Sequence, residues 1–199
     1  YVRPDHERQA KEILEKELPN IPISISYDVL PKWKEYERAS TTIADAYIKP
    51  VVRKQMDTIR ARFNENGITD HVAIIKSNGG EMTTDAAAQS PIQMTVSGPT
   101  GGVIAGKQIA RLAGVDHLVT FDMGGTSTDC STVVNGNESF TTDFDIEFGI
   151  PIQIPMIDIR TIGAGGGSIA WIDKGGMLRV GPESAGAEPG PACYGNGGK

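Results

Sequence analysis

The sequence has few cysteines and histidines, and this scarcity excludes several kinds of site. Its 199 residues include two cysteines, Cys130 and Cys193, and three widely separated histidines, His6, His71 and His117. Two cysteines are too few for a disulfide scaffold, which favours a reducing, cytoplasmic location. No His-x-His, His-Glu-x-x-His or Cys-x-x-Cys spacing occurs. A zinc site within this chain is therefore not expected.

The sequence also lacks an excess of positive charge and any long apolar run. Lys and Arg number 19 against 25 Asp and Glu, a formal net charge of −6. An acidic chain is a poor match for nucleic acid or an anionic membrane surface. No apolar run approaches the about 18 residues of a membrane-spanning helix. We therefore expect neither nucleic acid nor a membrane among its partners.

Glycine, in contrast, is abundant and unevenly placed. Of the 24 glycines, four lie in residues 1–100 and 20 in residues 101–199. They follow no three-residue period, which excludes a collagen-like chain. Because the chain opens on Tyr1 rather than Met and ends in Gly-Asn-Gly-Gly-Lys, we expect a fragment of a longer protein.

Before residue 117 the pattern favours helices and short strands. Helices are expected at residues 5–18, 32–64 and 100–113. Strands are expected at residues 23–27, 71–76 and 117–122. Asp5 is a candidate cap, Pro50 is expected to interrupt the second helix, and Gly67 to end it. The last two strands each follow a helix, which predicts an α/β fold.

After residue 126 the pattern changes to β-hairpins. Asn135-Gly136 is a strong turn signal between strands at 127–134 and 138–144. Gly175-Gly176 is a second one, between strands at 169–173 and 177–180. Apolar residues alternate from Ile146 through Phe148 to Met156, which predicts one long strand with a bend near residue 156.

The strongest local signal is Phe121-Asp-Met-Gly-Gly-Thr-Ser-Thr-Asp129. Glycines let backbone N–H groups approach a phosphate, hydroxyls add donors, and one or two carboxylates suit Mg²⁺. The alternative is a tight turn whose Asp and Thr side chains bond to their own backbone. The phosphate interpretation assigns Asp122 and Asp129 to the metal and to catalysis. It assigns the phosphates to Gly124, Gly125, Thr126, Ser127 and Thr128.

Two other glycine clusters resemble nucleotide motifs without matching them. Gly101 to Lys107 spells G-x-x-x-x-G-K, but Gln108 stands where a P-loop needs Ser or Thr, and a helix is expected there. Two alternatives stay open: an anion site at the helix start through Gly101 and Gly102, or close helix packing through Gly102, Ala105 and Gly106.

The other cluster, Thr161-Ile-Gly-Ala-Gly-Gly-Gly-Ser168, leads into an expected strand, whereas a dinucleotide fingerprint leads into a helix. It is either a loop that lines a nucleotide cleft with Gly165, Gly166 and Gly167, or a flexible turn.

Taken in order, six motifs resemble the hydantoinase A/5-oxoprolinase family. They are Val29-Leu-Pro-Lys-Trp-Lys-Glu-Tyr-Glu-Arg-Ala-Ser-Thr-Thr, Ser77-Asn-Gly-Gly, Ser97-Gly-Pro-Thr-Gly-Gly, the Phe121–Asp129 motif, Ile162-Gly-Ala-Gly-Gly-Gly-Ser-Ile-Ala and Gly181-Pro-Glu-Ser-Ala-Gly-Ala-Glu-Pro-Gly-Pro. The resemblance implies an actin/hexokinase-like (ribonuclease H-like) ATPase fold that binds ATP and Mg²⁺. Residues 1–116 would be its helical and α/β portion. Residues 117–199 would be its phosphate-loop portion, ending in a glycine-rich loop at 181–199.

The family resemblance also implies a function. Family enzymes use ATP to phosphorylate a carbonyl oxygen, which opens a cyclic amide such as hydantoin or 5-oxoproline. The alternatives are the ATP-binding subunit of an acetone-type carboxylase acting on a ketone, a reactivating chaperone, and a remnant that no longer binds nucleotide. A hydantoinase B-like subunit or domain is the expected partner. The family's second Asp-x-Gly-Gly-Thr is absent from these 199 residues, so we expect this segment alone to be inactive.

Overall fold

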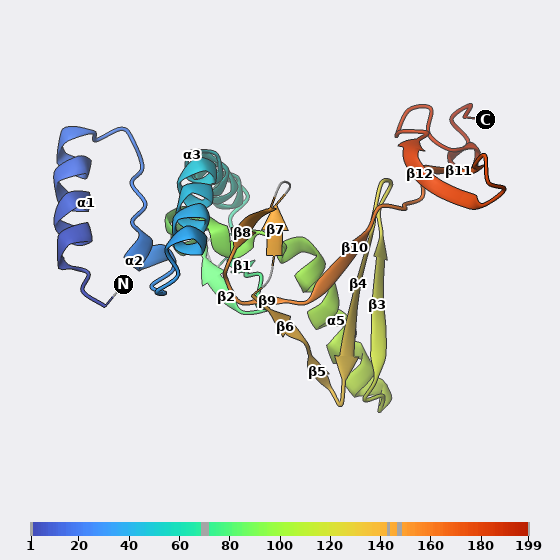
Figure 1. The fold of residues 1–199 in the computed structure, drawn as a ribbon, viewed down its shortest axis with the longest axis horizontal. Helices are drawn as coiled ribbons and strands as arrows, with labels where there is room; N and C mark the ends of the chain where they lie inside the picture. Colours follow the sequence, from blue (N-terminus) through green and yellow to red (C-terminus); the bar gives the residue numbers. More distant parts are fainter. Residues whose placement is uncertain (1, 69–71, 143, 147–148, 199) are drawn as a thin grey trace. The chain divides into compact units, whose positions relative to one another are not determined.

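The computed structural model describes residues 2–68, 72–142, 144–146 and 149–198, and Figure 1 labels their helices and strands. The chain forms two compact units. Unit 1 contains residues 1–100 and 140–157, and unit 2 contains residues 101–139 and 158–199. Each unit includes residues from both sides of position 116. The division of the domain into portions at 1–116 and 117–199 stays a prediction.

Helices dominate the first hundred residues of unit 1. They are α1 (Asp5–Glu17), α2 (Ser26–Val29), α3 (Glu35–Glu65), α4 (Thr84–Gln89) and the 3-10 helix η1 (Pro91–Met94). The helix predicted at 5–18 is confirmed as α1. Its predicted cap is wrong, because Pro4 holds the cap position and Asp5 is the first helical residue.

The predicted interruption at Pro50 is also wrong, because α3 runs through it for 31 residues. A proline removes one backbone hydrogen bond from a helix interior. Tertiary contacts on both sides of Pro50 outweigh that loss. Before Pro50 the Asp45 carboxylate accepts from the Ile92 N–H at 3.2 Å, and after it Met56 is buried. The helix ends at Glu65, two residues before Gly67, whose φ of +73° suits the predicted stop.

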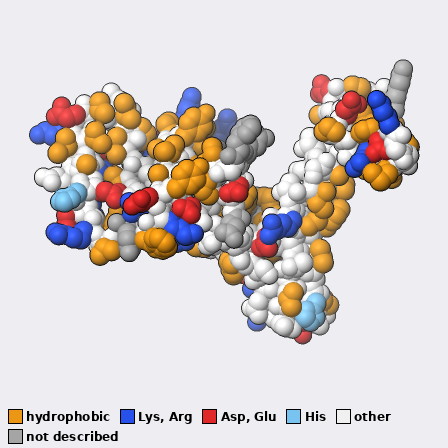
Figure 2. Space-filling model, viewed as in Figure 1, with side chains coloured by type: hydrophobic (Ala, Val, Ile, Leu, Met, Phe, Trp, Pro, Cys, Tyr) orange, Lys and Arg blue, Asp and Glu red, His pale blue; other side chains and the backbone are white. Residues whose placement is uncertain are grey.

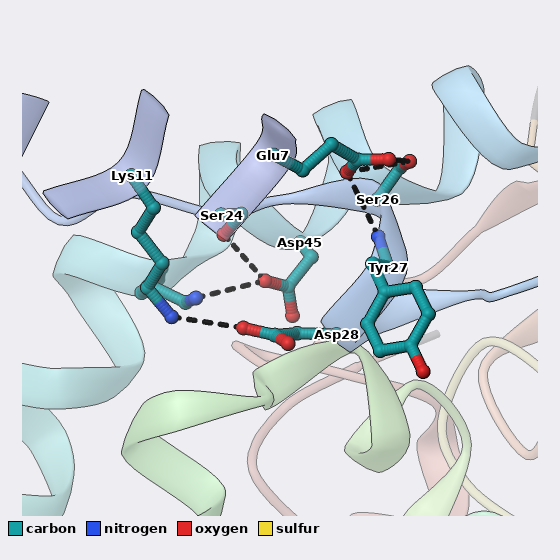
Figure 3. A network of polar contacts seen from close by, with 8 residues as sticks. Glu7, Lys11, Ser24, Ser26, Tyr27, Asp28 and Asp45 are labelled. Atoms are coloured by element: carbon teal, nitrogen blue, oxygen red, sulfur yellow. Dashed lines mark hydrogen bonds and ion pairs between the residues drawn. The ribbon is translucent and has the colours of Figure 1, made fainter. Parts of the chain in front are cut away.

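The strand predicted at 23–27 is wrong, because α2 begins at Ser26. Glu7 of α1 accepts hydrogen bonds from the Ser26 hydroxyl (2.9 Å) and from the Tyr27 N–H (3.0 Å), as Figure 3 shows. Burial raises the pKa of Glu7, but these hydrogen bonds outweigh it and leave the pKa below its ordinary value. A carboxylate from another helix therefore fixes the start of α2.

The core of unit 1 joins α3 and η1 to residues 140–157. Ile92 packs there with Ile152, Ile154 and Met156, and all four are buried. Beside this core, the buried carboxylate of Asp45 accepts from the Ser24 hydroxyl (2.7 Å) and the Ile92 N–H (3.2 Å). Asp45 therefore ties three segments of unit 1 together, and Figure 3 shows its bond to Ser24.

The strands of unit 1 form three short antiparallel pairs. These pairs are β1 (Ala73–Ile75) with β2 (Glu81–Thr83), β6 (Phe140–Thr141) with β9 (Met156–Ile157), and β7 (Phe144–Ile146) with β8 (Ile150–Ile152). The single long strand predicted from 146 to 156 is wrong, because the chain reverses between β7 and β8, where Gly149 has a φ of +70°. The predicted positions His71 and Phe148 lie outside the described residues.

Among its described residues, unit 2 contains a four-stranded antiparallel sheet, a helix and a separate hairpin. The sheet order is β10-β4-β3, from β10 (Ile159–Ile162), β4 (Thr128–Val134) and β3 (Leu118–Met123), and β5 (Asn137–Glu138) pairs with β4. Both predicted hairpin turns are confirmed: β4–β5 turns at Asn135-Gly136, and β11 (Ser168–Ile172) pairs with β12 (Leu178–Ser184). The 3-10 helix η3 (Ala192–Tyr194) follows. The strand predicted at 138–144 is wrong, because β5 ends at Glu138 and β6 pairs with β9 instead.

Helix α5 (Ser97–Ala113) begins in unit 1 and continues into unit 2. It starts three residues earlier than predicted. Together these elements confirm a mixed α/β fold. Hydrophobic side chains also reach the surface shown in Figure 2, and the exposed ones include Val119, Phe121 and Met123 on alternate positions of β3. No helix among the described residues is long and apolar enough to cross a membrane.

Candidate functional site

The predicted phosphate loop is the turn of the β3–β4 hairpin. Residues 124–127 connect Met123 to Thr128, which are register partners in the two strands. The Gly124 N–H donates to the Ser127 carbonyl at 2.9 Å and closes the turn. Both interpretations of the motif, a phosphate loop and a turn bonded to its own backbone, include such a tight turn. Phosphate binding by Gly124, Gly125, Thr126 and Ser127 therefore stays a prediction.

Asp122 and Asp129 are register partners across this hairpin. Directly opposite residues in an antiparallel pair project from the same face, so both carboxylates lie on one side of the hairpin. Asp122 is exposed, and Asp129 is half-buried and accepts from the Thr161 hydroxyl at 2.6 Å. Two like charges in opposed positions destabilise a sheet, and a cation between them would relieve that repulsion.

The Asp122–Asp129 pair suits Mg²⁺ better than a metal ion that takes all its ligands from the protein. No group of three or more His, Cys, Asp or Glu side chains among the described residues could hold a metal ion. Mg²⁺ usually takes one or two carboxylates and completes its shell with waters and substrate phosphates. Asp122 and Asp129 fit that requirement. Thr161, which orients Asp129, was missed as a site residue because sequence spacing does not reveal which strand lies beside β4.

Some hydrogen-bond donors in and beside the turn have a protein acceptor, whereas three backbone amides have none among the described residues. Thr128 is buried, and its hydroxyl donates to the Ala164 carbonyl at 2.5 Å. That hydroxyl already has a protein partner, so its predicted contact to phosphate has no support in the contacts. The N–H groups of Gly125, Thr126 and Ser127 have no acceptor among the described residues. Three free amides in a glycine-containing turn are suited to bind an anion.

The structure brings the third glycine cluster next to this turn. The Gly166 N–H donates to the Gly124 carbonyl at 2.9 Å, and the Gly167 N–H donates to the Gly125 carbonyl at 2.8 Å. The Gly165 N–H donates to the Ser168 hydroxyl at 2.9 Å. All three amides predicted to line a nucleotide cleft therefore bond within the protein. The expected strand after this cluster is confirmed as β11.

The second cluster packs a helix against the same hairpin. Gly101 and Gly102 are the fifth and sixth residues of α5, inside the helix rather than at its free amides. A Cβ at Gly102 would lie 3.9 Å from Asp122 Oδ2, and one at Gly106 would lie 3.0 Å from Thr120 Cγ2. Gly106 thus lets α5 approach β3 closely, whereas the distance at Gly102 is an ordinary van der Waals contact. Binding roles for Gly101 and Gly102 stay predictions.

The geometry agrees with the rejection of a P-loop at Gly101 to Lys107. Gly106 and Lys107 lie within α5, and the Lys107 ammonium pairs with the Glu138 carboxylate of β5. This ion pair holds the pKa of Glu138 below its ordinary value. Lys107 therefore already pairs with a carboxylate of its own unit.

Comparison with known proteins identifies the family to which this chain belongs. Residues 38–199 match the family model described as Hydantoinase/oxoprolinase. Because this match covers most of the chain, the chain belongs to the hydantoinase/oxoprolinase family, as its motifs predicted.

Individual relatives are similar over nearly the whole chain. It is 40% identical to the caprolactamase subunit alpha of Pseudomonas jessenii, over 98% of this chain and 28% of that protein. It is also 40% identical to the 5-oxoprolinase of Saccharomyces cerevisiae, over 100% of this chain and 15% of that protein. The chain thus spans less than a third of the length of these relatives.

Two solved structures have a similar fold. The crystal structure of the ATP-dependent caprolactamase from Pseudomonas jessenii superposes with a TM-score of 0.82 at 40% identity. A nucleotide-free acetone carboxylase superposes with a TM-score of 0.75 at 29% identity. Each comparison covers 98% of this chain and 28% of the other chain.

Proposed function

We propose that this chain is part of an ATP-dependent enzyme that phosphorylates the carbonyl oxygen of a cyclic amide, after which water adds to the carbonyl carbon, the ring C–N bond breaks and phosphate leaves. The observation that carries the proposal is the β3–β4 hairpin, which combines two opposed carboxylates with a turn of three free amides. An actin/hexokinase-like ATPase fold is part of the proposal. It is supported by the structural likeness to the ATP-dependent caprolactamase from Pseudomonas jessenii.

The residues of the hairpin have distinct roles in this proposal. When bound, ATP supplies the phosphoryl group that is transferred, and Mg²⁺ supplies positive charge that balances the negative charge of the phosphates. Asp122 and Asp129 would hold the cation, directly or through water. The N–H groups of Gly125, Thr126 and Ser127 would donate to phosphate oxygens, and such fixed donors stabilise developing negative charge. The absence of side chains at Gly124 and Gly125 leaves the backbone accessible.

An acetone-type carboxylase is the second candidate. It is favoured by the likeness to acetone carboxylase and by 31% identity to the acetophenone carboxylase gamma subunit of Aromatoleum aromaticum. Both candidates need a phosphorylated oxygen, on an amide in one case and on an enolate in the other, so the same hairpin would serve either. Because two of these relatives are named as subunits, a hydantoinase B-like subunit or domain is the proposed partner, and a cytoplasmic location is proposed with it.

One assay separates these candidates. The whole protein, produced with its partner subunit, is incubated with Mg²⁺ and ATP, and phosphate release is measured. Hydantoin, 5-oxoproline and caprolactam are tested as cyclic amides against acetone with bicarbonate. Stimulation by a cyclic amide is the expected result. Stimulation by acetone with bicarbonate alone would select the carboxylase, and stimulation by none of them would contradict both.

A further inference from the structure

Three glycine-rich segments of unit 2 lie against one another in series. The first is the 124–127 turn, the second is the loop at residues 164–167, and the third is the segment at residues 181–186. The first two are joined by the hydrogen bonds from Gly166 to Gly124 and from Gly167 to Gly125. The Thr128 hydroxyl adds a third bond to the Ala164 carbonyl. The 164–167 loop is thus attached to both ends of the turn.

The fit between the 164–167 loop and the turn leaves no room for a side chain. A Cβ at Gly165 would lie 2.6 Å from the backbone nitrogens of Thr126 and Ser127 and 2.7 Å from the Gly124 carbonyl oxygen. Cβ atoms do not approach backbone atoms this closely. Glycine at position 165 is therefore required for the contact.

The third segment supports the second. The Ala185 N–H donates to the Gly167 carbonyl at 2.7 Å, and the Trp171 indole N–H donates to the Gly181 carbonyl at 2.9 Å. A Cβ at Gly167 would lie 2.9 Å from the Ser184 hydroxyl oxygen. Residues 181–186 thus form the outer layer of this stack. The glycine-rich loop predicted at 181–199 is wrong at its start, because residues 181–184 belong to β12.

These bonds determine which way the free amides of the turn point. In a trans peptide unit the C=O and the following N–H point in opposite directions. The Gly124 and Gly125 carbonyls point toward the 164–167 loop, where they accept its hydrogen bonds. The Gly125 and Thr126 N–H groups belong to the same two peptide units, so they point away from that loop and have no protein acceptor among the described residues.

We propose that the 164–167 loop, with Gly165 at its centre, positions the phosphate-binding amides of the 124–127 turn. This inference rests on the proposed function, since it assumes that the turn binds the phosphates of ATP. The loop itself does not contact phosphate, because its three glycine N–H groups bond within the protein. Donors fixed before the ligand arrives need no reorganisation when it binds. Gly165 is thus a positioning residue.

The test compares Gly165→Ala with Gly163→Ala in the whole protein. Both variants add one methyl group in neighbouring positions, but a Cβ at Gly163 meets nothing within 4 Å. Two quantities are measured: amide hydrogen exchange of residues 124–128 in the nucleotide-free protein, and the Kd values of Mg²⁺·ATP and of adenosine. Gly165→Ala is expected to speed the exchange and to weaken ATP binding at least tenfold, with adenosine binding changed less than twofold. Gly163→Ala is expected to match the unmodified protein.

The adenosine measurement separates positioning from a general loss of structure. A damaged fold would weaken both ligands together, and that outcome would contradict the proposal. Equal exchange rates and equal ATP affinities for the two variants would also overturn it. If the unmodified protein binds no ATP, the proposed function fails, whereas the exchange comparison still decides whether the loop positions the turn.

A second variant covers the case in which Gly165→Ala does not fold. Ser168→Ala removes the hydroxyl that accepts from the Gly165 N–H without adding any atom to the contact. It is expected to change exchange and ATP affinity in the same direction by a smaller factor. No change in either quantity would contradict the proposal.

Discussion

Asp122 and Asp129 stand opposite each other in the β3–β4 hairpin, in a register that places two carboxylates side by side. This arrangement costs folding free energy unless a cation neutralises it, because like charges in directly opposed positions repel. The pair is therefore easier to explain by metal binding than by stability. That contrast gives the first prediction.

Asp122→Asn should reduce activity without reducing stability. In the whole protein we expect ATP turnover to fall by about 10²–10³, the cost of removing one group that stabilises transition-state charge. The free energy of unfolding should rise by about 0.2–1 kcal/mol, because a repulsion is removed. Turnover and urea unfolding measure the two effects. Asp116→Asn, an exposed position of the same unit, is the control, and normal turnover in Asp122→Asn would remove the metal assignment.

Asp45→Ala should strongly destabilise unit 1. Asp45 is fully buried, and its loss leaves the buried Lys49 ammonium, the Ser24 hydroxyl and the Ile92 N–H without their shared acceptor. Breaking a buried ion pair from one side costs about 3–5 kcal/mol. Urea unfolding monitored by circular dichroism tests this value. Asp57→Ala, an exposed position on the same helix, should change stability by less than about 0.5 kcal/mol. Equal effects of the two substitutions would show that the Asp45 contacts contribute little.

Glu138 should make stability depend on pH in the acid range. The hydrogen bond from Lys107 lowers its pKa in the folded state below the ordinary 4.5. The folded protein therefore binds this proton less readily than the unfolded chain. Stability from this group is fully present above pH 4.5 and is lost as the pH falls through the lowered pKa.

Unfolding measured from pH 6 downward, with Glu138→Gln as the comparison, isolates this effect. The substitution should flatten the acid limb of the stability curve, because it removes the titrating group while keeping a similar shape. An unchanged acid limb in Glu138→Gln would mean that the ion pair with Lys107 contributes nothing in solution.

Two glycines of α5 should respond to alanine in opposite directions. At Gly106 a Cβ would lie 3.0 Å from Thr120 Cγ2, and a β-branched side chain cannot easily rotate away. We expect Gly106→Ala to destabilise by about 1–3 kcal/mol. At the exposed Gly102 a Cβ would meet only Asp122 Oδ2, at the ordinary contact distance of 3.9 Å, so Gly102→Ala should stabilise by up to about 1 kcal/mol through helix propensity. Thermal unfolding of both variants tests the sign, and a stabilising Gly106→Ala would show that β3 yields to the helix.

Features determined by local chemistry could be predicted from the sequence. The hairpin at Asn135-Gly136 follows from two residues that accept positive φ, and both adopt it here. The rejection of a P-loop followed from Gln108 and from the helical pattern around Gly106. The family could be predicted because six motifs occur in order.

Features determined by distant residues could not be predicted. Residues 23–27 alternate like a strand, but the Glu7 carboxylate, far away in the sequence, fixes Ser26 and Tyr27 at the start of a helix. The bond between Gly166 and Gly124 joins segments about 40 residues apart, and neither segment carries a local sign of the other. The sequence indicated which residues are glycine, but it could not show which amides are free and which are bonded.

The composition of unit 1 has a consequence for how this protein is made. The buried partners of Ile92 in the described core, Ile152, Ile154 and Met156, all lie in residues 140–157. On the ribosome, the first hundred residues therefore emerge with part of their apolar core uncovered, and this part stays uncovered until residues 101–139 of unit 2 have also been synthesised. During that interval the nascent chain exposes an incomplete core, the state in which chains aggregate or engage chaperones. We expect truncation before residue 157 to give insoluble protein.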